Sequence, residues 1–445
     1  MRLLPLALLA AALAPLPASA NALLEIYRQA AQQDSTLQAA RHQRDASLEA
    51  RPQARAALLP QINGSFGRQE STEEGTEGFA GMPENPVSRD STSEALTLTL
   101  NQALFDWAAF RRYAQAGDSL MLAQTQYRAA EQSLVLRVAQ GYFNVLAAAD
   151  ALQFAQSQKA AVGRQLEQAQ RRFEVGLSAI TDVQEAQAAY DLTIAGELQA
   201  EQALATARQA LAVITGKRDN PTVPLREEIP LAGPQPAEVD RWVDAALENN
   251  LDLLAAGLGT RIAEKDVEIA RAGHYPTLGA QLQYQDATAE GSRFSGESET
   301  ETVGLQLNLP IFSGGLTQSR VSAAHSTFEQ RQAEQEGTRR GVEQRTRDAY
   351  LGVMSGAAQV RAYKQAVISS TTALEASETG FEVGTRTSVD VLNAQRDLFD
   401  ALRTYARARY DYLLSVLTLK QAAGRLTESD LAEIDGLLVN AAATR

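Results

Sequence analysis

Polar residues that could form ion pairs or hydrogen bonds stand close behind two copies of one tetrapeptide, Phe-Glu-Val-Gly. Thr181 and Asp182 follow the first copy, and Arg386 and Asp390 follow the second. A carboxylate can form a charge-assisted hydrogen bond with a guanidinium group, or it can attract cations from solution. An Asp in the first turn of a helix is also an ordinary capping residue, and the two roles can coexist. Arg386 could equally be a solvated side chain whose ion pairs contribute little.

No other set of residues has the spacing of a catalytic or metal site. His42, His274 and His325 lack ligand-like neighbours at metal spacing, and the chain contains no nucleophile elbow, phosphate-binding loop or dinucleotide fingerprint. The absence of cysteine removes disulfides, thiolate catalysis and a lipid-attached cysteine anchor. We therefore expect no enzyme activity, no catalytic or metal-binding residues and no cofactor.

The charge balance of the chain is strongly acidic. Among 445 residues, 54 Asp and Glu outnumber 41 Lys and Arg, which gives a formal charge of -13. A chain of this charge repels phosphates, so nucleic acid is not an expected partner.

The first twenty residues have the pattern of an export signal. Arg2 precedes an apolar stretch, and Ala18 and Ala20 fit a cleavage site for small residues, so residues 1–20 are predicted to be a signal peptide. No later apolar run reaches about 18 residues, the length that a membrane-spanning helix requires. If the mature chain enters a membrane, it must therefore do so as a closed sheet of strands.

The polar residues behind the tetrapeptides are placed by two tight turns between long helices. Gly176 and Gly384 stand where a left-handed cap would end a helix. The next helices are predicted to begin with capping boxes of the form Thr181-x-x-Gln184 and Thr387-x-x-Asp390. No proline lies between Pro86 and Pro221 or after Pro310, which permits very long helices. The predicted helical hairpins span about 110–215 and 314–424.

The same plan occurs twice in the chain. Segments recur after about 210 residues, too far apart for a solenoid repeat, so the pattern indicates a duplicated domain. For example, Leu98-x-Leu100-Asn101 recurs as Leu305-x-Leu307-Asn308. The predicted domains are a first repeat at 21–216, a proline-rich linker at 217–240, a second repeat at 241–424 and a terminal segment at 425–445.

Each repeat also contains a pair of strands, which alternating apolar residues reveal. Leu96, Leu98 and Leu100 share one face of a strand, and the segment from Val303 has the same alternation. With partners that begin after Pro60 and Pro276, the predicted strand hairpins span about 61–102 and 277–309. Polar segments at 68–93 and 286–301 are predicted to be loops, as in outer-membrane barrels.

Several segments, in order along nearly the whole chain, resemble the TolC family of outer-membrane efflux and secretion channels. The resemblance rests on Arg172–Gln184 (RFEVGLSAITDVQ), Val383–Leu392 (VGTRTSVDVL), Ala139–Leu146 (AQGYFNVL), Leu307–Gly315 (LNLPIFSGG) and Tyr363–Val367 (YKQAV).

This resemblance implies an α+β membrane protein that functions as a homotrimer. Four strands from each protomer would build a twelve-stranded barrel in the outer membrane, in contact with its lipid, and long helices would form a helical barrel in the periplasm. A belt around the helices would gather residues near 22–33, the linker with the helix from Ala237, and the terminal segment from Thr427. The implied partners are a periplasmic adaptor and an inner-membrane transporter of the ABC or RND type.

The resemblance also implies roles for residues at the two turns. Thr181 and Asp182 would face Arg386 in a periplasmic gate, with Phe381 where a relative has tyrosine, a change that removes one hydroxyl. Asp390 matches one acidic ring of the channel entrance. Asn393 stands at the position of a second ring, so only one ring is expected here.

The function implied is an exit duct for type I protein secretion, multidrug efflux or both. An alternative from another class is a periplasmic adaptor, since adaptors also contain long helical hairpins. Two strand pairs about 200 residues apart, without a compact lipoyl-like domain, count against the adaptor.

Overall fold

The computed structural model describes residues 22–78, 81, 85–291 and 295–439. The predicted signal peptide, residues 1–20, lies outside this part of the chain. The chain divides into two compact units, and each unit takes residues from both halves of the sequence. Unit 1 comprises Met1–Arg41, Tyr127–Leu253 and Arg339–Arg445, and unit 2 comprises His42–Gln126 and Leu254–Thr338.

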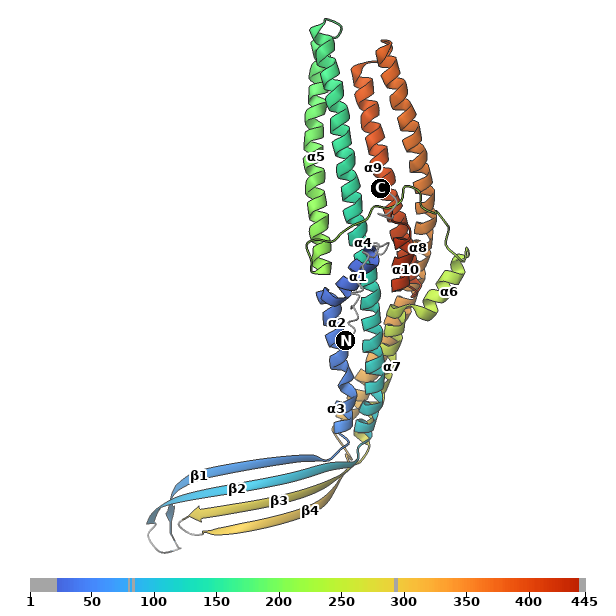
Figure 1. Ribbon diagram of the computed structural model, residues 1–445. Helices are drawn as coiled ribbons and strands as arrows, with labels where there is room; N and C mark the ends of the chain where they lie inside the picture. The colour runs from blue at the N-terminus through green and yellow to red at the C-terminus, as the bar shows by residue number, and fades with distance from the viewer. Residues whose placement is uncertain (1–21, 79–80, 82–84, 292–294, 440–445) are drawn as a thin grey trace, which may run out of the picture. The chain divides into compact units, whose positions relative to one another are not determined.

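Unit 2 contains a four-stranded antiparallel sheet (Figure 1). Its strands follow the order of the sequence: β1 (Gln61–Glu77), β2 (Asn85–Phe105), β3 (Thr277–Gly291) and β4 (Gly296–Asn308). The register places apolar residues opposite one another, for example Phe66 opposite Leu96 and Leu282 opposite Val303. These side chains are largely exposed in the single chain, up to 79% for Val303, so the sheet has an uncovered apolar face.

The strands extend further than the sequence predicted. Residues 68–93 and 286–301 were expected to be loops, but most of them continue the ladder, which runs to Glu77 opposite Asn85 and to Ala289 opposite Gly296. Polar pairs across the strands accompany this extension, such as Arg68 with Glu94 at 3.1 Å and the hydroxyl of Thr72 with Asp90 at 2.8 Å. A polar composition therefore does not end a strand when its side chains find partners across the ladder.

The helical elements of unit 2 are joined in part by ion pairs. The beginning of α4 (Trp107–Glu174) lies against α7 (Leu251–Arg271), where the Asp118 carboxylate forms ion pairs with Lys265 at 2.5 Å and with Arg261 at 3.2 Å. The unit also includes part of α2 (Ser35–Leu48), α3 (Ala50–Ala56), the short 3-10 helix Ala272–His274 and the start of α8 (Leu316–Glu382).

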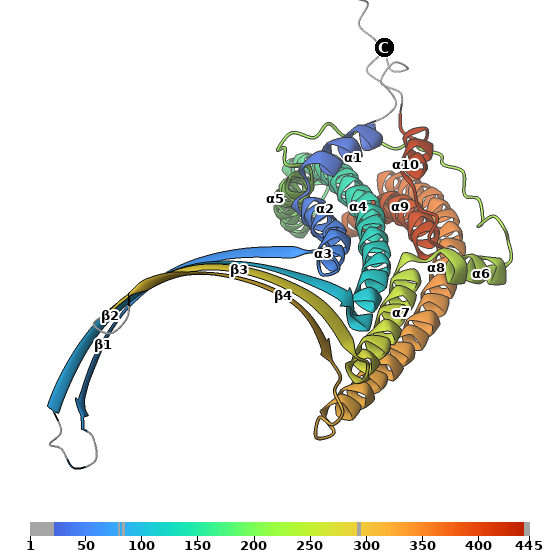
Figure 2. The ribbon, with the colours of Figure 1, turned by 90° about the horizontal axis from the view of Figure 1, so that it is seen from below.

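Unit 1 is built on four long helical segments that lie in the order α5, α4, α9, α8 (Figures 1 and 2). The helices α5 (Ile180–Thr215) and α9 (Ser388–Ala422) follow α4 and α8 across the two tight turns. Small residues allow close packing: a Cβ on Gly141 of α4 would lie 3.2 Å from Leu211 of α5. Helix α4 has 68 residues, which corresponds to about 100 Å at the helical rise.

Three short helices and the linker surround the core of unit 1. They are α1 (Ala22–Gln33), α6 (Val239–Asn249) and α10 (Glu428–Asp435), in the segments that the resemblance assigned to a belt. The buried core includes Leu23, Tyr142, Leu211, Tyr410 and Leu431.

Among the described residues, no helix combines the length and the apolar character needed to cross a membrane.

Candidate functional site

The first tight turn of unit 1 ends α4 and begins α5. Gly176 adopts φ 75°, which confirms the predicted left-handed cap, and the N–H of Leu177 donates to the carbonyl of Arg172 at 2.8 Å, which closes a Schellman motif. The prediction that Thr181 caps α5 is wrong, since the N-cap is Ala179, whose side chain cannot accept a hydrogen bond. Thr181 therefore lies inside the first turn, and Asp182 takes the third helical position.

The second turn has the same backbone and a complete cap. Gly384 adopts φ 79°, and the predicted capping box at Thr387 is confirmed. The N–H and hydroxyl of Thr387 donate to Oδ2 of Asp390 at 2.9 and 2.8 Å. Hydrogen bonds from the Thr387 backbone and hydroxyl, together with nearby Arg386, hold the pKa of the Asp390 carboxyl below its ordinary value. Asp390 is therefore ionised at neutral pH, with Oδ1 outside the cap.

The two turns are joined within the same chain by packing between their helices. A small apolar cluster contains Leu166 and Ala169 of α4 and Ala186 of α5, and Leu392 of α9 packs against it. Close to this cluster, the amide of Gln165 donates to the buried hydroxyl of Ser388 at 3.4 Å.

An arginine of the first turn also reaches an aromatic ring of the second. The guanidinium carbon of Arg172 lies 4.6 Å from the centre of the Phe381 ring, a cation–π distance. The sequence interpretation did not identify Arg172. A comparison of the repeats offers a signal, because Arg172 stands where the second repeat has Gly380.

The residues predicted to form the gate gather at the two turns but do not all contact one another. The backbone N–H of Asp182 donates to the carbonyl of Ala179 at 3.1 Å, but the Asp182 carboxylate forms no hydrogen bond or ion pair with Arg386 or with any other described residue of its own chain. Thr181, Arg386 and Asn393 are exposed. Contacts between Asp182 and Arg386 therefore remain a prediction that concerns neighbouring copies of the chain.

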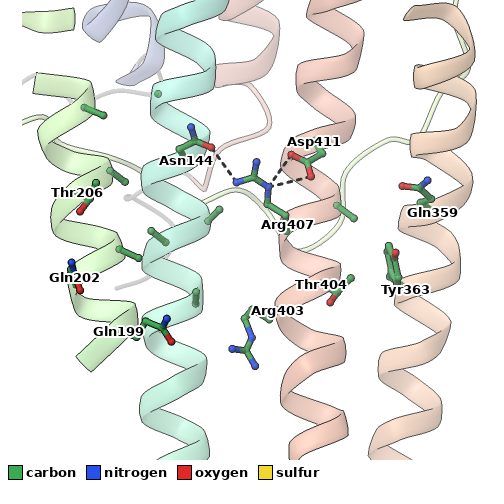
Figure 3. A pocket seen from close by; sticks show the side chains of 18 residues that line it. Asn144, Gln199, Gln202, Thr206, Gln359, Tyr363, Arg403, Thr404, Arg407 and Asp411 are labelled. Atoms are coloured by element: carbon green, nitrogen blue, oxygen red, sulfur yellow. Dashed lines mark hydrogen bonds and ion pairs between the residues drawn. The ribbon is translucent and has the colours of Figure 1, made fainter. Parts of the chain in front are cut away.

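A groove of about 940 Å³, lined by alanines and by polar side chains, lies among the four long helices of unit 1 (Figure 3). Alanines of α4 and α5 contribute to its lining, and the longer polar side chains come mainly from α5 and α9. On α9, Arg407 is held between Asn144 of α4 at 3.1 Å and Asp411 at 3.0 Å, so its guanidinium is fixed in the groove. Arg403 pairs with Asp400 on the same helix.

Tyrosines fasten the linker to the helices in unit 1. A proline-rich linker has few backbone N–H groups that could bond its carbonyl groups, and here tyrosine hydroxyls act as the donors. The Tyr142 hydroxyl donates to the carbonyl of Val223 at 3.1 Å, and the Tyr405 hydroxyl donates to that of Glu227 at 3.3 Å. The Tyr412 hydroxyl donates to the carbonyl of Ala232 at 2.7 Å, and the Tyr350 hydroxyl donates to that of Ala237. Arg409 adds hydrogen bonds to the carbonyls of Arg226 and Glu227 at 3.1 and 3.2 Å. The sequence interpretation did not foresee this set of contacts.

A buried charge cluster lies beneath the linker. The Tyr410 hydroxyl donates to Oδ2 of Asp150 at 2.7 Å, and Arg409 lies 4.0 Å from the same carboxylate. Burial raises the pKa of Asp150, against the effects of the Tyr410 hydrogen bond and of Arg409. Burial also raises the pKa of Tyr142, to about 12. Burial, and after it the Asp150 charge, also raise the pKa of Tyr410, so neither Tyr142 nor Tyr410 ionises at physiological pH and both act as hydrogen-bond donors.

The three histidines lie apart. His325 lies 3.8 Å from Glu329 on the same exposed helical face, and no group of three potential ligands occurs among residues that the structure places.

The sequence and the structure are both similar to those of known outer-membrane and secretion proteins. A family model described as "Outer membrane efflux protein" matches residues 26–217 and 242–425. The outer membrane protein TolC of Vibrio cholerae is 38% identical over 440 residues, which cover 98% of each chain. The alkaline protease secretion protein AprF of Pseudomonas aeruginosa is 32% identical, over 93% of this chain and 86% of its own.

Solved structures share the fold. The outer membrane protein VceC from Vibrio cholerae has a TM-score of 0.73 at 20% identity, over 90% of this chain and 96% of its own. A membrane protein from Pseudomonas aeruginosa has a TM-score of 0.77 at 21% identity, over 91% of each chain.

Proposed function

The chain belongs to the outer membrane efflux protein family, and we propose that three copies of it assemble into one exit duct. It is an outer-membrane channel protein of the kind that serves type I protein secretion and efflux. The family's members named above are channel and secretion proteins rather than enzymes. The adaptor alternative is set aside, because the relatives that match nearly the whole chain are outer-membrane proteins.

The observation that carries the trimer is the open sheet. Strands β1 and β4 are its two edges, and each leaves one row of backbone N–H and C=O groups without a partner among the described strands. The apolar face includes the exposed side chains of Ile62, Phe66 and Leu305 and suits lipid, where unpaired backbone groups are costly. Because a barrel needs about eight strands or more, four cannot close, whereas three copies supply twelve.

The tight turns of unit 1 form the periplasmic entrance in this proposal. The Asp182 carboxylate has no partner among the described residues of its own chain, and Arg386 is exposed, so the two side chains can meet between adjacent protomers. A threefold axis would turn Asp390 into a ring of three carboxylates, with Asn393 one turn further along α9. In this proposal, these residues keep the entrance closed in the resting channel.

The partners follow from the family. Channels of the TolC family act with periplasmic adaptors and inner-membrane transporters, and we propose the same for this chain, with a transporter of the ABC or RND type. Cargo of either class, secreted protein or small molecule, is compatible with a duct whose energy comes from its partners.

Purified protein in detergent tests the proposal directly. Light scattering corrected for detergent should give three times the mass of the mature chain, and planar bilayers should show discrete conductance steps. A well-folded monomer that produces no conductance would contradict both the assembly and the duct.

A further inference from the structure

We propose that Arg172 is a positioning residue of the periplasmic entrance, which holds the tip of the second helical hairpin against the first within one protomer. The inference rests on the proposed function of the tips and adds a link that the gate residues described above do not include. Its basis is the placement of the Arg172 guanidinium 4.6 Å from the centre of the Phe381 ring.

The contact joins two helices whose residues here lie about 200 positions apart in the sequence. Arg172 lies in the last turn of α4, and Phe381 lies at the end of α8. Both side chains are partly buried, so the pair is less hydrated than two mobile surface groups. A cation over an aromatic face gains electrostatic attraction that grows as water is excluded.

The two repeats differ at this position in a way that makes the link one-directional. The counterpart of Arg172 is Gly380, where an added Cβ would lie 2.6 Å from Cγ of Arg386. The absence of a side chain there lets Arg386 fold back over its own turn. The first tip thus extends an arginine to the second hairpin, whereas the equivalent position of the second tip has no side chain that could reach the first hairpin.

Arg171 provides a contrast on the same helix. Its side chain is 78% exposed and pairs with Glu167 at 3.5 Å, one turn back on α4. Two adjacent arginines therefore have different tasks, because positions one residue apart on a helix point about 100° away from each other.

The contact with Arg172 depends on the aromatic ring of Phe381 and does not require a hydroxyl group on that ring. Phe381 stands where a relative has tyrosine, and it cannot donate a hydrogen bond to Asp182. Its face can still accept a cation, so the aromatic ring keeps a connection between the tips without the hydroxyl.

The test uses the full-length trimer in planar bilayers, with open and closed conductance levels measured for single variants. Arg172→Gln and Phe381→Leu should each raise the ratio of open to closed states by about two- to five-fold per link, the range expected for a partly exposed cation–π pair. Arg172→Lys should keep much of the closed state, and Phe381→Tyr should stay close to wild type. Arg171→Gln is the matched control and should leave the ratio unchanged.

A double variant separates positioning from general loosening. Arg172→Gln combined with Phe381→Leu should open the channel no more than either change alone, whereas Arg171→Gln should combine additively with Phe381→Leu. The thermal midpoint of the trimer should be the same in all these variants. Additive effects of Arg172→Gln and Phe381→Leu, or an Arg172→Gln channel identical to wild type, would overturn the inference while leaving the duct intact. Wild-type protein that forms no channel at all would overturn the proposed function together with it.

Discussion

Asp182 and Asp390 occupy equivalent positions in the two repeats, but their carboxylates have different surroundings. Asp390 accepts two hydrogen bonds from Thr387, which fix its orientation. The counterpart of Thr387 is Ala179, which has no hydroxyl, so Asp182 has no cap to complete. The loss of one hydroxyl in the first repeat thus leaves Asp182 available for a partner outside its own turn.

This availability leads to a prediction for the gate. Arg386→Ser and Asp182→Ala should each raise the ratio of open to closed conductance states, by up to about five-fold, because each removes one member of an exposed ion pair between protomers. Single-channel recordings in planar bilayers measure the ratio. The isosteric Asp182→Asn variant should fall between Asp182→Ala and wild type. Unchanged ratios in both Arg386→Ser and Asp182→Ala would show that the proposed contacts do not exist.

The charge of Asp390 leads to a second prediction, for cation block. A ring of three carboxylates attracts multivalent cations, whereas Asn393 can offer only neutral dipoles. We expect moderate cation selectivity and weak block by divalent cations in wild-type channels. Asn393→Asp should lower the blocking concentration by at least about three-fold, and Asp390→Asn should abolish most block.

Bilayer recordings at fixed salt test this second prediction, since screening weakens such fields. Both variants keep Thr387, so that its hydroxyl still caps α9. Block that is the same in both variants would show that neither side chain lines the pore.

At the scale of elements, the sequence was sufficient wherever a local pattern decides the structure. Alternating apolar residues, with Pro60 and Pro276 before two of the segments, located the four strands, and the φ values of Gly176 and Gly384 match the predicted caps. The predicted loops were wrong because partners across the ladder, such as Arg68 and Glu94, cannot be seen in one strand alone. The contact of Arg172 with Phe381 was missed for the same reason, since it joins residues about 200 positions apart.

Helix α2 is tied to α4 by a buried ion pair, and this pair makes stability depend on pH. Asp34 accepts the N–H of Leu37 at 2.7 Å and both terminal nitrogens of Arg137 at 2.9 Å. Burial alone would raise the pKa of Asp34, but the hydrogen bonds from Arg137 and Leu37 outweigh it and lower the pKa below its ordinary value. Because the folded pKa is the lower one, the stabilisation is present above the unfolded value of about 3.9 and is lost as the pH falls.

The third prediction follows from this sign. Asp34→Asn should lower the free energy of unfolding by about 2 kcal/mol at pH 7, in line with hydrogen bonds to charged groups. The difference from wild type should shrink below about pH 4, where wild type also loses its carboxylate. Urea unfolding at pH 7 and pH 3 measures this difference, with Asp45→Asn as the control, since the Asp45 carboxylate on α2 is half-exposed and pairs with the neighbouring Arg44. A difference that does not change with pH would contradict the assigned charge.

At the scale of the whole molecule, the helices of unit 1 form a layer with two distinct faces. On α9, Tyr405 and Arg409 bind the linker, and Arg403 and Arg407, two residues before each, line the groove. A separation of two residues is about 200° around a helix, so the linker and the groove lie on opposite faces of α9. In a closed ring the linker would obstruct the interior, so we infer that the grooved face lines the duct.

The two outer helices of this layer have apolar side chains that no described residue of the single chain covers. On α5, Leu192 is 74% and Val213 75% exposed, and each stands two residues after Tyr190 or Leu211, which contact α4. On α8, Leu351 is 62% exposed and stands two residues before a buried valine. Both flanks therefore point away from the neighbouring helix of the same chain, as a head-to-tail ring requires.

The last prediction uses these flanks to separate assembly from folding. Burial of a leucine contributes about 2 kcal/mol, so a charge there should weaken each interface roughly 30-fold. Leu192→Glu on α5 and Leu351→Glu on α8 should each shift purified protein from trimer to monomer as it is diluted, measured by light scattering. Helical content by circular dichroism should stay unchanged, because neither side chain packs inside its own chain. Thr404→Glu adds the same charge to the groove of α9 and should leave the trimer intact. If Leu192→Glu and Leu351→Glu form trimers as stable as those of Thr404→Glu, α5 of one protomer does not meet α8 of the next, and the ring must close through other surfaces.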